Sequence, residues 1–462
     1  MQLPDLTRTI VAPASAPGGG ALAVIRISGP GAFRAAAAFL RPVSFCENPK
    51  ERSVRLMRAE DGGELLDRPM AVFYRAPKSY TGENMAEVFC HGSPYIVSRM
   101  LKLAMDGGAR EARPGEFTLR AFLNGKLDLA QAEAVNDLII SEGGSAHRAA
   151  ITQLEGGISR GVRKARAGLI KLLGELEVRL DDPYGEIPAL AARSFLSRAG
   201  NIAAGLKELA DSFEKGRRLK HGIRVTIAGA PNSGKSSLLN RLAGRDRSIV
   251  SPCAGTTRDT VEEAAELAGL AVIFTDTAGI NPGTKDAVER EGMRRSLAAM
   301  GSADIILWVR DGSLENSEAD LLVERAIERR AAPGADLIKV FNKSDLRAAR
   351  PRKELREGLS VSCRTGKGLT ELKRLLAGEE KKMLSAESSC VVTSARHYSA
   401  LTAANKELSR LADLGKGEPE GFPLELAAEH LRGALNSLAE IIGETTPEEV
   451  LAGIFRNFCV GK

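Results

Sequence analysis

The segment GAPNSGKS at residues 229–236 decides how the middle of the chain folds. It follows the strand-like run RVTIA (224–228) and precedes SLLNRL, whose apolar spacing is typical of a helix. A glycine-rich loop between a strand and a helix binds phosphate, because its backbone N–H groups and the helix N-terminus face the anion. Gly229 and Gly234 let the backbone approach the phosphates, and Lys235 adds a positive charge. This segment predicts a nucleoside triphosphate site.

Three later motifs indicate that the base is guanine. DTAG at 276–279 ends a strand-like run, where Asp276 can hold Mg²⁺ through water and the Gly279 N–H can meet the γ-phosphate. NKSD at 342–345 ends another run, and Asp345 can accept N1–H and N2–H of guanine. Ser362, Cys363 and Arg364 fit a loop over guanine O6. Their order, each at the carboxyl end of a strand, predicts GTP as the ligand.

The segment GTTRD at 255–259 lies between the phosphate loop and DTAG. Thr257 is the candidate second Mg²⁺ ligand and γ-phosphate sensor, and the alternative is a simple Gly-Thr turn. Ile280 follows DTAG where many regulatory GTPases carry a water-orienting glutamine. Asn232 and backbone oxygens of the 251–256 loop could instead hold K⁺, which would supply transition-state charge.

The predicted nucleotide site can be stated by role. The GTP contacts are Gly229, Asn232, Ser233, Gly234, Lys235, Ser236, Ser237, Ser251, Thr256, Thr257, Asp276, Thr277, Ala278, Gly279, Asn342, Lys343, Asp345, Ser362, Cys363 and Arg364. Ser236 and Thr257 are the predicted Mg²⁺ ligands, and Lys235 and Asn232 are predicted to take part in catalysis.

Composition fits a globular chain of two to four domains, with 43% hydrophobic and 27% charged residues among 462. The net charge of +6 permits nucleic-acid contact without requiring it. The six cysteines form no C-x-x-C pair, so neither a zinc site nor a disulfide framework is indicated. The N-terminus lacks the pattern of a signal peptide, and no stretch approaches a membrane span. We expect a cytoplasmic protein.

The pattern of apolar and turn-forming residues changes along the chain and predicts a multidomain α/β protein. Residues 1–120 mix short strand-like runs, such as ALAVIRIS (21–28), RPMAVFYRAP (68–77) and MAEVFCHG (85–92), with glycine and proline turns, which indicates an α+β module. Residues 217–379 alternate strand-like and helical runs, as in a doubly wound P-loop domain.

Helical pattern covers 121–216 and 380–462, on both sides of this α/β unit. Apolar stripes are formed by Leu169, Leu172, Leu173, Leu176 and Leu180, and by Leu431, Leu435, Leu438 and Ile442. Thr446–Glu449 (TPEE) predicts a capping box with proline at the first helical position. The two segments are either one helical domain interrupted by the α/β unit or two unrelated ones.

Several segments outside the nucleotide motifs carry a family resemblance over essentially the whole length. They are GGGALAVIRISGPGAF (18–33), SYTGENMAEVFCHG (79–92), ARPGEFTLRAFLNGKLDLAQAEAVNDLI (112–139), VEREG (288–292) and the terminal FCVGK (458–462). Together with the GTP motifs, they make the chain resemble the MnmE (TrmE) family of tRNA-uridine-modifying GTPases.

The resemblance implies an N-terminal folate-binding domain that forms a homodimer, a split helical domain and an inserted Ras-like G domain. It implies K⁺-stimulated GTP hydrolysis driven by G-domain dimerisation. It also implies a partnership with the FAD-containing protein MnmG, which together with this chain would add an aminomethyl-type (carboxymethylaminomethyl) group to C5 of wobble uridine in certain tRNAs.

The resemblance also assigns site residues. Arg26, Glu87, Lys126 and terminal Lys462 match contacts to 5-formyltetrahydrofolate. Asn232, Ser251, Cys253 and Thr256 fall where the family holds K⁺, and Glu289 matches the acidic residue that positions water. From chemistry alone, Arg26 could be a surface arginine, Glu87, Lys126 and Glu289 could face solvent, and Cys459 could be a buried apolar residue or a reactive thiol.

Two features depart from the family pattern. The stretch INPGTKDAVEREG at 280–292 is one residue longer than the family pattern, and Cys253 stands where an aliphatic residue is expected. Two other functions also fit a G domain. A ribosome-assembly GTPase would need an RNA-reading module, and the chain after residue 379 shows only helix and FCVGK. A GTP-switched scaffold would have no modification chemistry of its own.

Overall fold

The computed structural model describes residues 5–49, 52–141, 143–182, 184, 186–243, 262–267, 270–276, 294, 297–315, 317–332, 334–346, 357–384, 391–416 and 422–461. The chain divides into two compact units. The first is formed by Met1–Ile139, Ile151–Ala210 and Arg396–Lys462, and the second by Ile140–Ala150 and Asp211–Ala395. Among the described residues, no helix combines the length and the apolar character needed to cross a lipid bilayer.

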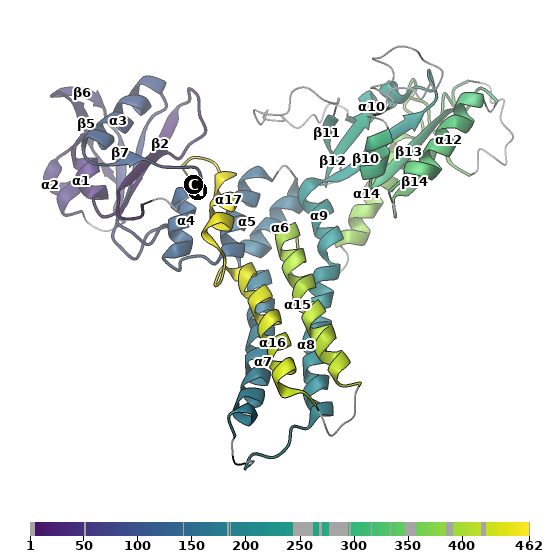
Figure 1. The fold of residues 1–462 in the computed structure, drawn as a ribbon. Helices are drawn as coiled ribbons and strands as arrows, with labels where there is room; N and C mark the ends of the chain where they lie inside the picture. Colours follow the sequence, from purple (N-terminus) through teal and green to yellow (C-terminus); the bar gives the residue numbers. More distant parts are fainter. Residues whose placement is uncertain are drawn as a thin grey trace. The chain divides into compact units, whose positions relative to one another are not determined.

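The first unit begins with a six-stranded sheet in the order β4-β7-β8-β2-β1-β9. Figure 1 labels β2 and β7 of this sheet. Its strands are β1 (Ile10–Pro13), β2 (Leu22–Ser28), β4 (Arg55–Leu56), β7 (Met70–Tyr74), β8 (Met85–His91) and β9 (Arg110–Glu111). The three strand-like runs of the sequence are thus confirmed as β2, β7 and β8. Because side chains alternate along a strand, Ile25 and Ile27 enter the core while Arg26 lies on the other face of β2.

Smaller elements complete this N-terminal module. Helices α1 (Ala32–Ala37) and α3 (Pro94–Asp106) pack against the large sheet, and α2 (Val43–Glu47) packs against α1. A second sheet is formed by β3 (Leu40–Arg41), β5 (Arg58–Asp61) and β6 (Glu64–Asp67). The core is built from small and aliphatic side chains around Phe39 and Phe73. This packing fixes the sheet whose outer face carries the site described below.

Helices form the rest of the first unit. They are α4 (Glu116–Leu123), α5 (Leu129–Ile140), α7 (Gly157–Leu180), α8 (Ala192–Asp211), α15 (Ala395–Leu414), α16 (Leu424–Ile442) and α17 (Glu448–Arg456). Helix α6 (Gly144–Leu154) is divided between the two units, because the second unit includes it as far as Ala150. Helices α7 and α16 run side by side in Figure 1 and contact each other. Leu169 and Leu172 are buried on α7, as are Leu431 and Leu438 on α16. The two apolar stripes therefore belong to one helical bundle, with the second unit inserted between them in sequence.

The predicted capping box is wrong in detail. Helix α17 starts at Glu448, but Pro447 is its N-cap residue and not its first helical residue. The Pro447 carbonyl accepts the N–H groups of Val450 and Leu451. The Thr446 hydroxyl donates to the Glu440 carbonyl at 3.3 Å, so it ties the turn back to the end of α16 and does not cap α17.

The second unit contains a six-stranded sheet in the order β11-β12-β10-β13-β14-β15. The elements are α9 (Phe213–His221), β10 (Ile223–Gly229), α10 (Lys235–Ala243), β11 (Glu262–Leu267), β12 (Leu270–Asp276), β13 (Ile305–Asp311), α12 (Glu318–Arg330), β14 (Asp336–Asn342), β15 (Leu359–Ser360) and α14 (Leu369–Leu384). All neighbours pair in parallel except β11 and β12. Parallel strands bring their carboxyl ends to one edge, which is where the nucleotide motifs lie.

Candidate functional site

The phosphate loop connects β10 to α10 in a strained backbone path. Asn232 has φ 58° and Gly234 has φ 92°, both in the left-handed region. A side chain at Gly234 would collide with the Asn342 amide, and one at Gly229 would collide with the Val309 carbonyl oxygen. Both glycines are therefore required by the neighbouring strands as well as by any ligand.

Lys235 begins α10 and is buried inside this loop. Its Nζ donates to the carbonyl oxygens of Gly229 and Ala230, both at 3.0 Å. Ser233 is 2% exposed, and its Oγ has no hydrogen-bond partner among the described residues. A buried cation and an unsatisfied buried hydroxyl in a loop of backbone amides fit a polyanionic ligand. The residues present therefore fit a triphosphate.

Asn342, at the end of β14, joins the phosphate loop to the predicted base loop. Its Nδ2 donates to the Ser233 carbonyl at 3.0 Å, and its Oδ1 accepts the Cys363 N–H at 3.2 Å. Asn342 is 2% exposed, so neither bond competes with water. One side chain thus couples two loops that are 109 and 21 residues away from it in sequence.

The predicted base reader Asp345 is exposed and is held by Ser362. The Ser362 hydroxyl donates to Asp345 Oδ1 at 2.6 Å, and this hydrogen bond lowers the pKa of the Asp345 carboxyl. Asp345 is therefore ionised at neutral pH and can accept two N–H groups. Arg241 on α10 donates to the carbonyl oxygens of Cys363 and Arg364, at 2.8 and 3.1 Å. The strand before this loop, β15, ends at Ser360, and the Ser362 N–H donates to the Lys367 carbonyl at 2.9 Å.

The structure adds a partner for Lys343 that the sequence did not suggest. Lys343 has φ 62°, and its Nζ contacts Asp311 Oδ2 at 2.6 Å. Burial alone would raise the pKa of Asp311, but hydrogen bonds from Lys343 and Ser313 hold it below its usual value. Asp311 ends β13, next to β14 in the sheet. The sequence could have pointed to Asp311, because it follows the apolar run IILWV (305–309). Acidic residues at the carboxyl ends of parallel strands lie at the same edge of a sheet.

Other predicted nucleotide residues can be placed only in part. Ser236 and Ser237 are exposed in the first turn of α10, and Asp276 is the last residue of β12. The remaining ones lie outside the described residues, so the structure does not place them. They are Ser251, Cys253, Thr256, Thr257, Thr277, Ala278, Gly279, Glu289 and Lys462.

A second candidate site lies on the N-terminal sheet of the first unit. Arg26 and Glu87 are directly paired in the register of β2 and β8. Arg26 Nε and Nη2 contact Glu87 Oε1 at 2.9 and 2.8 Å, and the two side chains are 14% and 13% exposed. The Arg26 guanidinium also stacks near the rings of Tyr80 and Phe117, at 5.3 and 5.7 Å from their centroids. The surface interpretation of Arg26 and the solvent-facing interpretation of Glu87 are therefore both wrong.

The C-terminal segment reaches this arginine. Arg26 Nη1 donates to the Gly461 carbonyl at 3.2 Å, and the Gly115 N–H donates to the Cys459 carbonyl at 3.3 Å. Cys459 itself is exposed, which contradicts its interpretation as a buried apolar residue. Phe458 takes the buried position and packs with Phe455, so the next side chain points outward.

A pocket of about 350 Å³ opens beside this ion pair. Glu87 and Lys126, two residues assigned by the family resemblance, both line it. Its other lining residues are Arg52, Tyr74, Lys78, Ser79, Tyr80 and Met85. Tyr74 donates its hydroxyl to Glu87 Oε2 at 3.2 Å, and burial followed by the nearby Glu87 charge raises the pKa of Tyr74. Tyr80 shares the family-type segment 79–92 with Glu87, but no local pattern pointed to Tyr74, and it is the fold that brings Tyr74, Tyr80 and Lys126 together.

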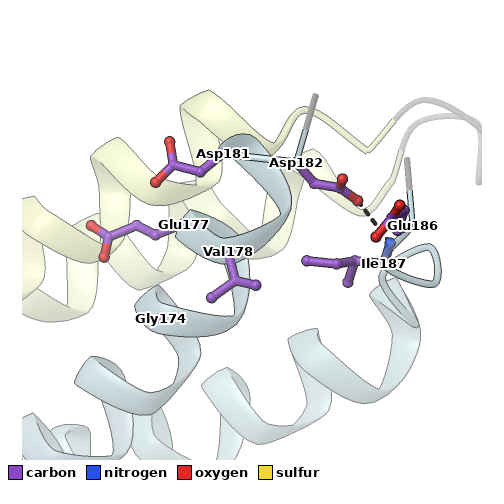
Figure 2. A pocket seen from close by; sticks show the side chains of 7 residues that line it. All are labelled: Gly174, Glu177, Val178, Asp181, Asp182, Glu186 and Ile187. Atoms are coloured by element: carbon purple, nitrogen blue, oxygen red, sulfur yellow. Dashed lines mark hydrogen bonds between the residues drawn. The ribbon is translucent and has the colours of Figure 1, made fainter. Parts of the chain in front are cut away.

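A larger pocket of about 570 Å³ lies where α7 ends (Figure 2). Its lining is acidic, and Figure 2 shows Asp182 turned toward the loop that follows the helix. Asp182 accepts the backbone N–H groups of Tyr184 and Ile187, at 3.3 and 2.7 Å. This carboxylate therefore stabilises the loop turn, and no residue predicted from the sequence lies here.

Two family models match this chain. The one described as "GTP-binding protein TrmE N-terminus" matches residues 9–126, which include the pocket beside Arg26 and Glu87. The one described as "MnmE helical domain" matches residues 129–459.

Curated relatives match over nearly the full length. A protein of Akkermansia muciniphila is 41% identical over 99% of this chain and 100% of its own length. One of Syntrophotalea carbinolica is 40% identical over 98% of this chain and 99% of its own. One of Thermotoga maritima is 38% identical over 98% and 100%. Each is described as a tRNA modification GTPase MnmE. This chain therefore belongs to the MnmE family of tRNA modification GTPases.

Proposed function

We propose that this protein hydrolyses GTP to drive a modification of tRNA carried out with an FAD-containing partner, MnmG. The product is a carboxymethylaminomethyl-type group at C5 of the wobble uridine. The observation that carries this proposal is the sequence identity to tRNA modification GTPases, which extends over nearly the whole chain. We call the phosphate loop (229–236) and the loops that carry Asp345 and Ser362 the nucleotide cradle. Asn342 joins the phosphate loop to the Ser362 loop, and this arrangement supports the GTPase part of the proposal. We also propose that the protein acts in the cytoplasm.

The described residues support a division of labour at the nucleotide. Lys235 exchanges its two carbonyl contacts for phosphate oxygens, which places its charge where negative charge grows during phosphoryl transfer. Asp345, kept ionised by Ser362, selects guanine. Ser236 and Thr257 would hold Mg²⁺, which neutralises phosphate charge when bound. Asn232, Ser251, Cys253 and Thr256 would hold K⁺, and Glu289 would position the attacking water.

The N-terminal pocket suits a reduced folate such as 5-formyltetrahydrofolate. Glu87 offers carboxylate oxygens to ring N–H donors, Tyr80 offers an aromatic ring and Met85 an apolar side chain. Arg26 holds Glu87 in place and also contacts the chain end, so Lys462 is proposed as a further contact. We also propose that the protein acts as a homodimer.

Nucleoside mass spectrometry of tRNA tests the function. Cells that lack this protein should lose the C5-modified wobble uridine, and a plasmid copy should restore it. A copy with Lys235→Ala should fail to restore it, while Lys373→Ala on α14 should succeed. Unchanged wobble uridine in the deletion strain would remove the modification function and leave the ribosome-assembly and scaffold alternatives.

The cation proposal has its own measurement. GTP turnover should rise strongly in KCl relative to NaCl of equal ionic strength, because K⁺ is expected to supply charge in the transition state and Ile280 cannot orient the attacking water. Equal turnover in the two salts would remove the K⁺ assignment.

A further inference from the structure

The two ends of the N-terminal pocket differ in charge. Glu87 and Met85 lie at the inner end, where their side chains are largely buried. Arg52, Lys78 and Lys126 line the same pocket and are exposed. One carboxylate therefore lies inside and three cationic side chains lie at the mouth.

The inner end has the chemistry of a heteroaromatic binding site. Glu87 Oε1 is held by Arg26, and Oε2 accepts the Tyr74 hydroxyl, while a carboxylate oxygen can accept more than one hydrogen bond. Tyr80 is fixed by a 2.8 Å hydrogen bond between its hydroxyl and that of Thr118. A rigid aromatic wall beside an oriented carboxylate suits a flat ring with N–H donors.

The cationic mouth is organised around one turn of the backbone. Lys126 Nζ donates to the Pro77 carbonyl at 3.1 Å, and Arg52 Nη2 donates to the Lys78 carbonyl at 3.3 Å. These bonds to carbonyl oxygens orient the head groups at the opening. Arg52 itself has φ 56°, a left-handed conformation that costs a non-glycine residue free energy.

We infer that Arg52, Lys78 and Lys126 bind the carboxylates of a γ-linked glutamate tail, so that the natural ligand is a polyglutamylated reduced folate. This inference rests on the proposed folate function of the pocket. A volume of about 350 Å³ accommodates a bicyclic ring and its immediate substituent, so a longer tail must leave through the mouth. Each added glutamate brings another carboxylate to three cations, and such exposed pairs add small, salt-sensitive increments of affinity.

Calorimetry on the full-length protein tests the inference with 5-formyltetrahydrofolate that carries one or three glutamates. At low salt the triglutamate should bind roughly three- to tenfold more tightly, and high NaCl should remove most of this gain. Arg52→Gln combined with Lys78→Gln should abolish the gain. Arg52→Lys, which keeps the charge, should retain part of it. Lys164→Gln, an exposed lysine on α7, is the matched control and should keep all of it.

The outcomes separate this inference from the folate proposal. Equal affinities for the two ligands in the unchanged protein would overturn the tail site and leave the folate pocket standing. A gain that survives both high salt and the double substitution would also overturn it, because the cations at the mouth would not be its source. No heat with either ligand would overturn the tail site and the folate pocket together.

Discussion

The nucleotide cradle and the N-terminal pocket are assembled in opposite ways. The cradle consists of short contiguous motifs, each following one of the parallel strands of a single sheet. The pocket joins Arg26 to Glu87, 61 residues later, and to the Gly461 carbonyl, 435 residues later. The residues of the cradle stand within these motifs, whereas the pocket is lined by side chains from distant segments. The comparison teaches that a site made of contiguous loop motifs can be predicted from local sequence. The contacts of a site made of side chains from distant strands cannot be predicted in this way.

The largest expected effect is at the cradle. Lys235→Ala should lower GTP turnover roughly 10²–10³-fold, because a preorganised charge at the phosphates is lost. Phosphate release at saturating GTP measures this, with Lys373→Ala as the matched control. Folate binding to the first unit should be unchanged. Turnover within about twofold of the unchanged protein would contradict the assignment of Lys235.

The next largest effect is on the stability of the helical bundle at acid pH, through an ion pair that, like the pocket, joins distant segments of the chain. Glu133 on α5 contacts Arg396 and His397 on α15, both at 2.8 Å. Burial would raise the pKa of Glu133, but the His397 and Arg396 charges and hydrogen bonds lower it to about 2 from its usual 4.5. A lowered pKa stabilises the fold fully above about pH 4.5, and this stabilisation is lost as the pH falls toward 2.

The helical bundle should therefore lose about 2–3 kcal/mol between these pH values through Glu133. Hydrogen exchange of peptides covering α5 and α15, corrected for intrinsic rates, measures this loss. Glu133→Gln should flatten the pH dependence, while Glu371→Gln, an exposed residue of α14, should not. The same slope in Glu133→Gln would show that other groups cause it.

A smaller effect is expected at the link between the two nucleotide loops. Asn342→Ala leaves the Ser233 carbonyl and the Cys363 N–H without their buried partner, which costs about 1–2 kcal/mol in nucleotide affinity. Titration with a fluorescent guanine nucleotide measures the change. Asn240→Ala, an exposed asparagine of α10, is the control. Equal affinities of the two variants would mean that the loops hold their positions without Asn342.

The smallest effect is expected at the pocket. Arg26→Gln keeps a hydrogen-bond donor but removes the charge beside Glu87, so folate affinity should fall roughly three- to tenfold. Calorimetry with 5-formyltetrahydrofolate measures it, and GTP turnover in the absence of folate should not change. Arg34→Gln, outside the pocket lining, is the control. If Arg26→Gln binds as tightly as the control, the ion pair only supports the sheet.

Several features were predictable because they depend on neighbouring residues. The strands that precede the phosphate loop and NKSD were confirmed as β10 and β14, since apolar runs bounded by turn residues rarely fit another element. The apolar stripes on α7 and α16 also follow directly from periodicity. Their mutual packing did not, because an apolar stripe indicates burial without specifying its partner.

Other sequence-based predictions were wrong or missing for individual residues. Thr446 has the spacing of a cap, yet its hydroxyl bonds to Glu440 because the end of α16 lies within reach. Cys459 faces outward because Phe458 occupies the buried position. Arg52, Lys78 and Tyr74 carried no pattern that linked them to Glu87. Each outcome was decided by a competing neighbour from another segment.

The sequence by itself determined the phosphate loop and the family of the chain, and it predicted which motifs read guanine. These depend on backbone conformations and hydrogen bonds that a few consecutive residues specify. Only the tertiary structure decided that Arg26 is buried against Glu87, that Asn342 bridges two loops and that three cations surround one pocket mouth. Strand register and loop packing bring these residues together, and both are set by the summed burial of many side chains across the fold.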